Sequence, residues 1–257
     1  MYKPTRVLVP LAAAAITMAI APMATASSAN GTTYGASLSQ INHSGGSGML
    51  TLTLKGRTAT INEHWSGLAA TFSGAPYPHV QHIHIDGQGV CPTVSADKNG
   101  DGVISTTEGA PAYGGIGTTL SVRGDTSPAA ATNLKIAPSG SSTDYHRTIT
   151  LDAKTVQSIK AGTAVIVVHG LDPSTLSKKA QGEKSDLVPS LPLAATSPAL
   201  CGTLTAMPVG GPQTGSGSTA GTEDLGLFGL GGGLLTFAGA GLLWARKRDR
   251  LDAPTQS

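Results

Sequence analysis

Four of the seven histidines have a spacing that could serve metal chemistry. Three of them form an H-x-x-H-x-H pattern: His79, His82 and His84. His169 ends a separate apolar run, 165–169. In a β-strand the side chains of residues i and i+2 point to the same side, so His82 and His84 can reach one ion. Imidazole suits copper or zinc, so His82, His84 and His169 are candidate ligands of one metal; packing and hydrogen bonds to loop carbonyls are the equally weighted alternative.

A second group of ligand-type residues lies in 97–108. This segment matches the calcium pattern D-x-[DN]-x-[DN]-G-x5-E at every specified position and resembles the loop of an EF-hand. Such loops bind through alternate residues and close with a bidentate glutamate. The expected ligands are Asp97, Asn99, Asp101, the carbonyl of Val103, Ser105 and Glu108. We expect one calcium ion that stiffens the connection, and an acidic turn without metal is the alternative. Prolines on both sides disfavour long flanking helices.

The elements that must position these residues are short strands. Runs of β-branched and alternating residues are separated by Gly, Pro, Asn and Ser clusters. They predict strands at 49–54, 59–65, 80–85, 118–122, 133–136, 147–151, 165–169 and 202–206. Only 152–160 has a helical pattern, with Asp152 as its cap and Gly162 as its stop. The fold class is therefore expected to be all-β, a Greek-key sandwich or barrel over residues 27–206.

Residues 1–26 have the features of a secretory signal peptide: a basic start, an apolar run and a small-x-small cleavage site, Ala24–Ala26. Residues 27–206 would then be exported. Both cysteines, Cys91 and Cys201, lie in this exported region, and we expect them to form a disulfide.

The C-terminal part carries the features of an anchor. Residues 207–224 are rich in Gly, Ser, Thr and Pro and predict a linker. Residues 225–245 have no charge and predict a transmembrane helix, and the basic tail 246–257 places that end in the cytoplasm. Pro212–Gly215 resembles a cell-wall sorting signal, but position 211 is Gly rather than Leu. Membrane anchoring with the domain outside is expected, and cell-wall attachment is the alternative.

Composition and charge exclude two classes of protein. The chain has 257 residues, 39% hydrophobic and 12% charged, which is too apolar for a disordered chain. Six of the 17 basic residues and four of the 15 acidic residues lie near the ends, so the middle is formally neutral. This distribution gives no electrostatic support for a nucleic-acid partner.

In four places, taken in order, the sequence resembles the copper/zinc superoxide dismutase family. His79–His84 resembles that family's H-G-F-H-V-H strand, and the residues up to Cys91 resemble its disulfide loop. Val167–His169 resembles its V-V-H strand, and Cys201-Gly202 its C-terminal C-G. The resemblance implies copper ligands at His82, His84 and His169, a structural His79, and copper that cycles between two oxidation states.

The sequence also departs from that family. After Cys91 there is no histidine until His146, so the metal-bridging histidine and the zinc ligands are missing and zinc is not expected. A fourth copper ligand is missing too, unless His43, His64 or His146 reaches the site. The arginine that guides anions is absent before Cys201, and Arg147 is the candidate replacement.

The segment resembles the related CHRD modules as well, which share a His-x-His strand. That resemblance implies a non-catalytic extracellular binding or structural module, in which the histidines only pack and hydrogen-bond. Whether the protein is an enzyme is therefore left open between these two families.

Overall fold

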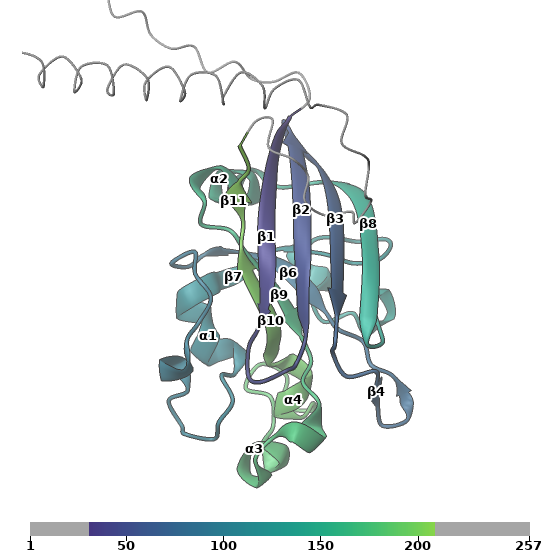
Figure 1. Cartoon of the computed structure of the whole chain (residues 1–257), viewed down its shortest axis with the longest axis vertical. Helices are drawn as coiled ribbons and strands as arrows, with labels where there is room; N and C mark the ends of the chain where they lie inside the picture. The colour runs from purple at the N-terminus through teal and green to yellow at the C-terminus, as the bar shows by residue number, and fades with distance from the viewer. Residues whose placement is uncertain (1–30, 209–257) are drawn as a thin grey trace, which may run out of the picture. The chain divides into compact units, whose positions relative to one another are not determined.

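The computed structural model describes residues 31–208 (Figure 1). The predicted signal peptide (1–26), transmembrane helix (225–245) and tail (246–257) lie outside the described residues, as does nearly all of the predicted linker, 207–224. Within the described part of the chain, no helix is long and apolar enough to cross a membrane.

The described residues form one curled antiparallel sheet of nine strands and a small hairpin. The order in the sheet is β7-β6-β9-β10-β1-β2-β3-β8, and β11 pairs with β1. The strands are β1 Thr32–Gln40, β2 Ser47–Lys55, β3 Thr58–Ser66, β4 Thr71–Phe72, β5 Ala75–Pro76, β6 Gln81–Asp86, β7 Gly114–Thr119, β8 Ser142–Thr150, β9 Val165–His169, β10 Pro198–Thr203 and β11 Thr205–Ala206. The expected all-β class is confirmed.

The long strand β1 joins the two halves of the sheet. Its last residues pair with β10, while most of its length pairs with β2 (Figure 1). Alternate residues of β1, β2 and β3 are buried, as expected for a sheet with one face in the core and the other exposed to solvent. Leu50, Leu52 and Ile61 pack with Ile83 and Ile166 from the other half in one main core. Full burial of each such side chain contributes about 1.5–3 kcal/mol.

One predicted strand is wrong, one is displaced and one long strand was not predicted. The predicted strand at 118–122 is displaced, because β7 covers Gly114–Thr119. The predicted strand at 133–136 is wrong, because Leu134–Ile136 forms a 3-10 turn in which the Asn133 side chain accepts a hydrogen bond from the Lys135 amide. A capping side chain of this kind competes with strand pairing. The strand β1 was not predicted, although Tyr34, Ala36 and Leu38 alternate as buried residues.

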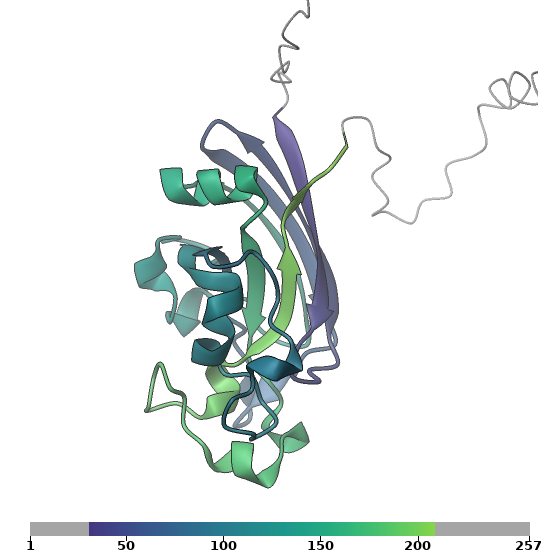
Figure 2. The same ribbon diagram turned by 90° about the vertical axis from the view of Figure 1, so that its left-hand side faces the viewer.

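The predicted helix is confirmed as α2, Ala153–Ala161. Asp152 caps its start, and Gly162 ends it with a φ of 70°. Three helices were not predicted: α1 Thr106–Tyr113, α3 Lys178–Gly182 and α4 Leu193–Thr196. In Figure 2, α1 and α2 lie to the left of the sheet, whose right-hand part is β1. Both helices contact β6 and β7. The helices thus cover the half of the sheet that carries the histidines.

Candidate metal centre

Neighbouring strands bring the three predicted ligands together. β6 and β9 pair antiparallel, with His82 opposite Val167, so His169 is the diagonal neighbour of His82 on the same face. The intervening Ile83 and its neighbours on β9 point instead into the main core. The strand alternation that the sequence shows therefore separates a core face from a histidine face.

The histidine side chains converge on one point. One ring nitrogen from each of His82, His84 and His169 lies within 4.8 Å of the other two. The ring centroids are 5.3–5.9 Å apart. All three residues are buried, with at most 4% of their surface exposed. Within residues 31–208, this is the one such group of three or more His, Cys, Asp or Glu side chains.

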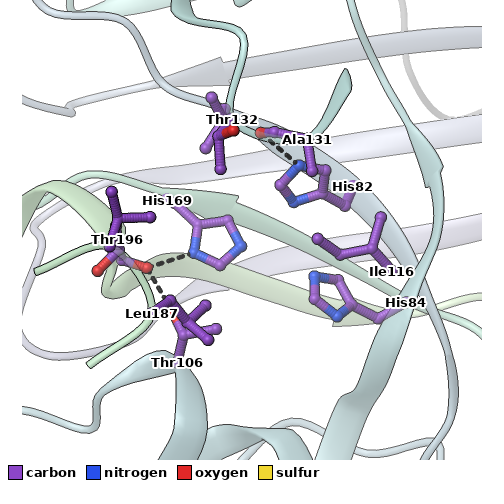
Figure 3. A pocket seen from close by; sticks show the side chains of 11 residues that line it. His82, His84, Thr106, Ile116, Ala131, Thr132, His169, Leu187 and Thr196 are labelled. Carbon is purple, nitrogen blue, oxygen red and sulfur yellow. Dashed lines mark hydrogen bonds between the residues drawn. The ribbon is translucent and has the colours of Figure 1, made fainter. Parts of the chain in front are cut away.

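Backbone carbonyls determine which ring nitrogens face that point. His82 donates from Nε2 to the carbonyl of Ala131 at 3.1 Å, and His84 from Nδ1 to that of Gly114 at 2.9 Å. His169 donates from Nδ1 to the carbonyl of Thr196 at 2.7 Å (Figure 3). A carbonyl only accepts, so each of these nitrogens carries the hydrogen. The other nitrogen of each ring therefore presents a lone pair.

These three lone pairs are buried and have no partner. They belong to Nδ1 of His82, Nε2 of His84 and Nε2 of His169. Leaving one buried polar atom unpartnered costs about 1–3 kcal/mol. Three unpartnered acceptors that face each other call for a Lewis acid between them, and a metal cation is the ligand that fits.

The rings are neutral and ready to bind a metal. Burial lowers the pKa of His84 to about 3, with a further contribution from the nearby His169. Burial lowers the pKa of His169 to about 4, and it holds the pKa of His82 well below the usual value. A charged imidazolium in this place would lack solvation and would repel its neighbours. No proton therefore has to leave for a metal to enter above about pH 5.

A small cavity of about 50 Å³ opens over the three rings (Figure 3). Besides the histidines it is lined by Val80, Thr106, Ile116, Ala131, Thr132, Leu187, Val188 and Thr196. Most of these residues come from the segments after β7 and before β10. The sequence offered no signal for them, because loops far apart in the chain meet here only after folding.

His79 lies apart from this cluster. Its ring is fully buried and contacts the backbone carbonyls of His169 and Ala69, both at 3.0 Å. It also packs edge-on against Trp65, at a centroid distance of 5.2 Å. These contacts fit the structural role implied by the resemblance, and they place His79 directly behind the last residue of β9.

None of the three histidines considered as a fourth ligand joins the site. His64 and His146 lie on the exposed face of β3 and β8, where they contact Asp144 and Asn62. His43 is exposed in the turn after β1. Arg147 does not line the cavity either; its guanidinium donates to Ser121 and to the carbonyl of Gly124.

The predicted disulfide between Cys91 and Cys201 is confirmed, with Cα atoms 5.8 Å apart. Cys201 lies opposite Val167 on β9, two residues before His169. The bond therefore attaches the connection after β6 to β10, which pairs with β9, the strand that ends in His169. A smaller core of Ile41, Ile104, Tyr113, Val165 and Val167 surrounds it.

The predicted calcium loop is closed by its own hydrogen bonds. The Asp97 carboxylate accepts from the amides of Gly100 and Gly102, and Asp101 accepts from Val103. Glu108 accepts from the amide of Ser105 in a capping box that starts α1. The helix thus begins inside the motif, because Ser at the cap and Glu three residues later satisfy the first amides. The carboxylates of the segment 97–108 do not form a converging group like that of the histidines.

No family profile matches the chain, and no curated protein matches its sequence. Among solved structures it is similar to a mutant of superoxide dismutase 5 from Candida albicans, at 13% sequence identity. That similarity has a TM-score of 0.39 and covers 73% of this chain and 99% of the other. This similarity concerns the fold alone.

Proposed function

We propose that this protein is an exported copper-binding β-domain whose ligands are His82, His84 and His169. The observation that carries the proposal is the set of three buried, unpartnered nitrogen lone pairs within 4.8 Å of one another. Each opposite N–H is held by a backbone carbonyl, which is the usual way in which proteins orient metal-bound imidazole. No alternative donor among the described residues satisfies these atoms.

Copper fits this donor set best. An all-imidazole site disfavours calcium and magnesium, which take oxygen ligands. Among divalent first-row metals, nitrogen sites bind copper most tightly. Zinc sites have four ligands, or three and an open position, so zinc is the competitor that an experiment must separate. Bound copper would supply one-electron chemistry on a small molecule; the chain itself orients the rings and excludes water with apolar walls.

Metal analysis tests this proposal directly. The full chain, made in an oxidising compartment and purified in mild detergent, is loaded with copper, desalted and analysed by mass spectrometry. We expect about one copper per chain, and its loss in the double variant His82→Ala/His169→Ala. The control is His64→Ala/His146→Ala, which removes two exposed histidines and should keep the metal. A wild-type chain without copper, or a double variant that retains it, would refute the proposal.

The resemblance to superoxide dismutases and to CHRD modules leads to two candidate functions. The first is superoxide chemistry at the copper. The second is a non-catalytic surface module, and one observation favours it: no charged side chain within residues 31–208 lines the cavity. Superoxide is an anion, and fast turnover needs a cation that attracts it. A superoxide assay on the copper-loaded chain, with the His82→Ala/His169→Ala variant as blank, separates the two.

The segment 97–108 is proposed as a second, structural site, which binds calcium. Its support is the sequence pattern, with Asp97, Asn99, Asp101, Ser105 and Glu108 at ligand positions and the Val103 carbonyl between them. Bidentate binding by Glu108 would require its carboxylate to leave the capping box. Calcium should therefore raise the melting temperature of the wild type and not of Glu108→Gln. An equal shift in both would exclude this site.

Export and anchoring are part of the same proposal. A disulfide is typical of proteins outside the reducing cytoplasm, which supports a signal peptide at 1–26. A transmembrane helix at 225–245 would keep the domain at the surface, with cell-wall attachment as the alternative. Protease treatment of intact cells should remove the domain, and detergent rather than wall-digesting enzymes should release it. Release by wall digestion alone would indicate cell-wall attachment.

A further inference from the structure

The cavity over the histidines offers no charge to a ligand. Its walls are formed by Val80, Ile116, Ala131, Leu187 and Val188, with three threonines between them (Figure 3). No Lys or Arg of the described part of the chain lines it. Its volume of about 50 Å³ is sufficient for a molecule of two or three heavy atoms. An anion that enters loses its hydration and gains no cationic side chain.

The hydrogen-bond donors around the cavity are already used. All three ring N–H groups are donated to backbone carbonyls, as described above. The Thr106 hydroxyl donates to the carbonyl of Thr196, the same oxygen that His169 uses (Figure 3). The Thr196 hydroxyl donates to the Ser185 hydroxyl at 2.7 Å. The remaining side-chain hydroxyl is that of Thr132, an exposed residue. Anion sites normally present several converging donors, and this cavity presents at most one.

The charged residue next to the cavity wall in the sequence is acidic. Asp186 directly precedes the lining residue Leu187, and the Ser105 hydroxyl donates to its carboxylate at 2.8 Å. Ser105 in turn directly precedes the lining residue Thr106. The Asp186 carboxylate therefore lies beside two wall segments of the cavity, and its negative charge opposes an approaching anion.

From these three observations we infer that the site takes a small neutral diatomic molecule, of the dioxygen or carbon monoxide class, in preference to a small anion such as superoxide. This inference rests on the proposed copper site and names its substrate class. Apolar walls favour a neutral guest, and the only strong interaction available to it is with the metal itself. Selection is then a property of the wall residues Leu187 and Val188 and of the neighbouring Asp186.

Two probes of similar size separate the alternatives. Carbon monoxide is neutral and binds Cu(I), and its stretching band is followed by infrared spectroscopy. Azide is an anion and binds Cu(II), and it is followed by its charge-transfer absorption. With the full chain loaded with copper, we expect carbon monoxide to bind at about one per copper. We expect the azide concentration that half-saturates the wild type to be at least about tenfold higher than the one that half-saturates a variant with a positive charge beside the cavity.

That variant is Leu187→Lys, and Leu187→Gln is its matched control. A cation at the exposed Leu187 position should strengthen azide binding about tenfold or more and leave carbon monoxide binding within about twofold. Asp186→Asn should strengthen azide binding about two- to fivefold without a new cation. The glutamine control, which makes the wall polar without adding a charge, should strengthen azide binding less than Leu187→Lys does and leave carbon monoxide binding within about twofold.

The outcomes separate the two proposals. If metal analysis finds no copper, the copper site and this inference fail together. If copper is present but carbon monoxide does not bind, the inference alone fails. It also fails if wild-type azide binding is as tight as in Leu187→Lys, because the walls would then exert no selection against anions.

Discussion

Relative to the Glu63→Gln variant, the native protein is expected to lose stability as the pH rises above 6.5. Glu63 lies on β3 in the row of Ala59, Ile61 and Trp65, and all four point into the core. Neither carboxyl oxygen has a hydrogen-bond partner, and the facing Tyr145 hydroxyl has none either. Burial raises the pKa of Glu63 to about 8, and the nearby Gln81 side chain lowers it by less than burial raises it.

The sign follows from proton binding. Below about pH 4.5 the carboxyl is protonated in both the folded and the unfolded chain. Between pH 4.5 and 8 the unfolded chain has released a proton that the folded chain still holds, so the free energy of unfolding falls as pH rises. The slope is about 1.4 kcal/mol per pH unit, or about 5 kcal/mol over the whole interval. Above pH 8 both states are ionised and this contribution is constant.

The buried histidines titrate in the opposite sense. The folded pKa of His169 is about 4 and that of His84 about 3, and burial also lowers the pKa of His79 and His82, so all four lie below their unfolded value of 6.5. They raise the stability as pH increases up to about pH 7.5, where the unfolded histidines have lost their protons. Their contribution is the same in the wild type and in Glu63→Gln, so the difference between the two proteins isolates Glu63. Between pH 6.5 and 8 the wild type is expected to lose about 2 kcal/mol relative to Glu63→Gln.

The assay is urea unfolding of the copper-free protein at closely spaced pH values. The wild type should lose about 2 kcal/mol relative to Glu63→Gln between pH 6.5 and 8. Asp144→Asn, the same kind of change on a fully exposed carboxylate, should follow the wild type. Parallel curves for the wild type and Glu63→Gln would show that Glu63 is ionised and paired in the folded protein, and the reasoning would be refuted.

Three further predictions concern the metal site and its support. Copper affinity should be nearly constant from pH 5 to 8 and fall below about pH 4, because His84 and His169 must then lose protons; a competition titration measures this. The disulfide closes a loop with a sequence separation of 110 and so limits the freedom of the unfolded chain; the double variant Cys91→Ser/Cys201→Ser should therefore lose about 4–5 kcal/mol of stability in urea, and an unchanged midpoint would contradict this. Thr106→Val, which leaves one donor on the carbonyl that orients His169, should weaken copper about three- to tenfold, and Thr106→Ser should restore it; equal affinities would exclude a positioning role.

Much of the sheet could be predicted because alternation is a local property. β3 is an example: a strand was predicted at 59–65, and its alternate residues Ala59, Ile61 and Glu63 share the buried face. The helix α2 was predictable because its cap and stop residues are adjacent to it in sequence. By contrast, the helix α1 was missed because its first turn lies within a calcium-type motif, and the motif was interpreted as a loop throughout.

The sequence alone determined which residues could bind a metal and which strand face would carry them. The spacing of His82 and His84, and the strand that ends in His169, follow from the period of a β-strand, which needs no knowledge of the rest of the chain. The two cysteines could be paired because the described region contains only that pair.

Only the tertiary structure decided that three lone pairs face one another without a partner. The carbonyls of Gly114, Ala131 and Thr196 determine which nitrogen of each ring carries the hydrogen. They come from segments 27–49 residues away from the histidines that they contact. The apolar wall and Asp186 at the mouth are likewise brought to the site by chain connections. Local sequence determines periodicity and capping, whereas the protonation and the selectivity of a buried site depend on which distant groups replace the solvent around it.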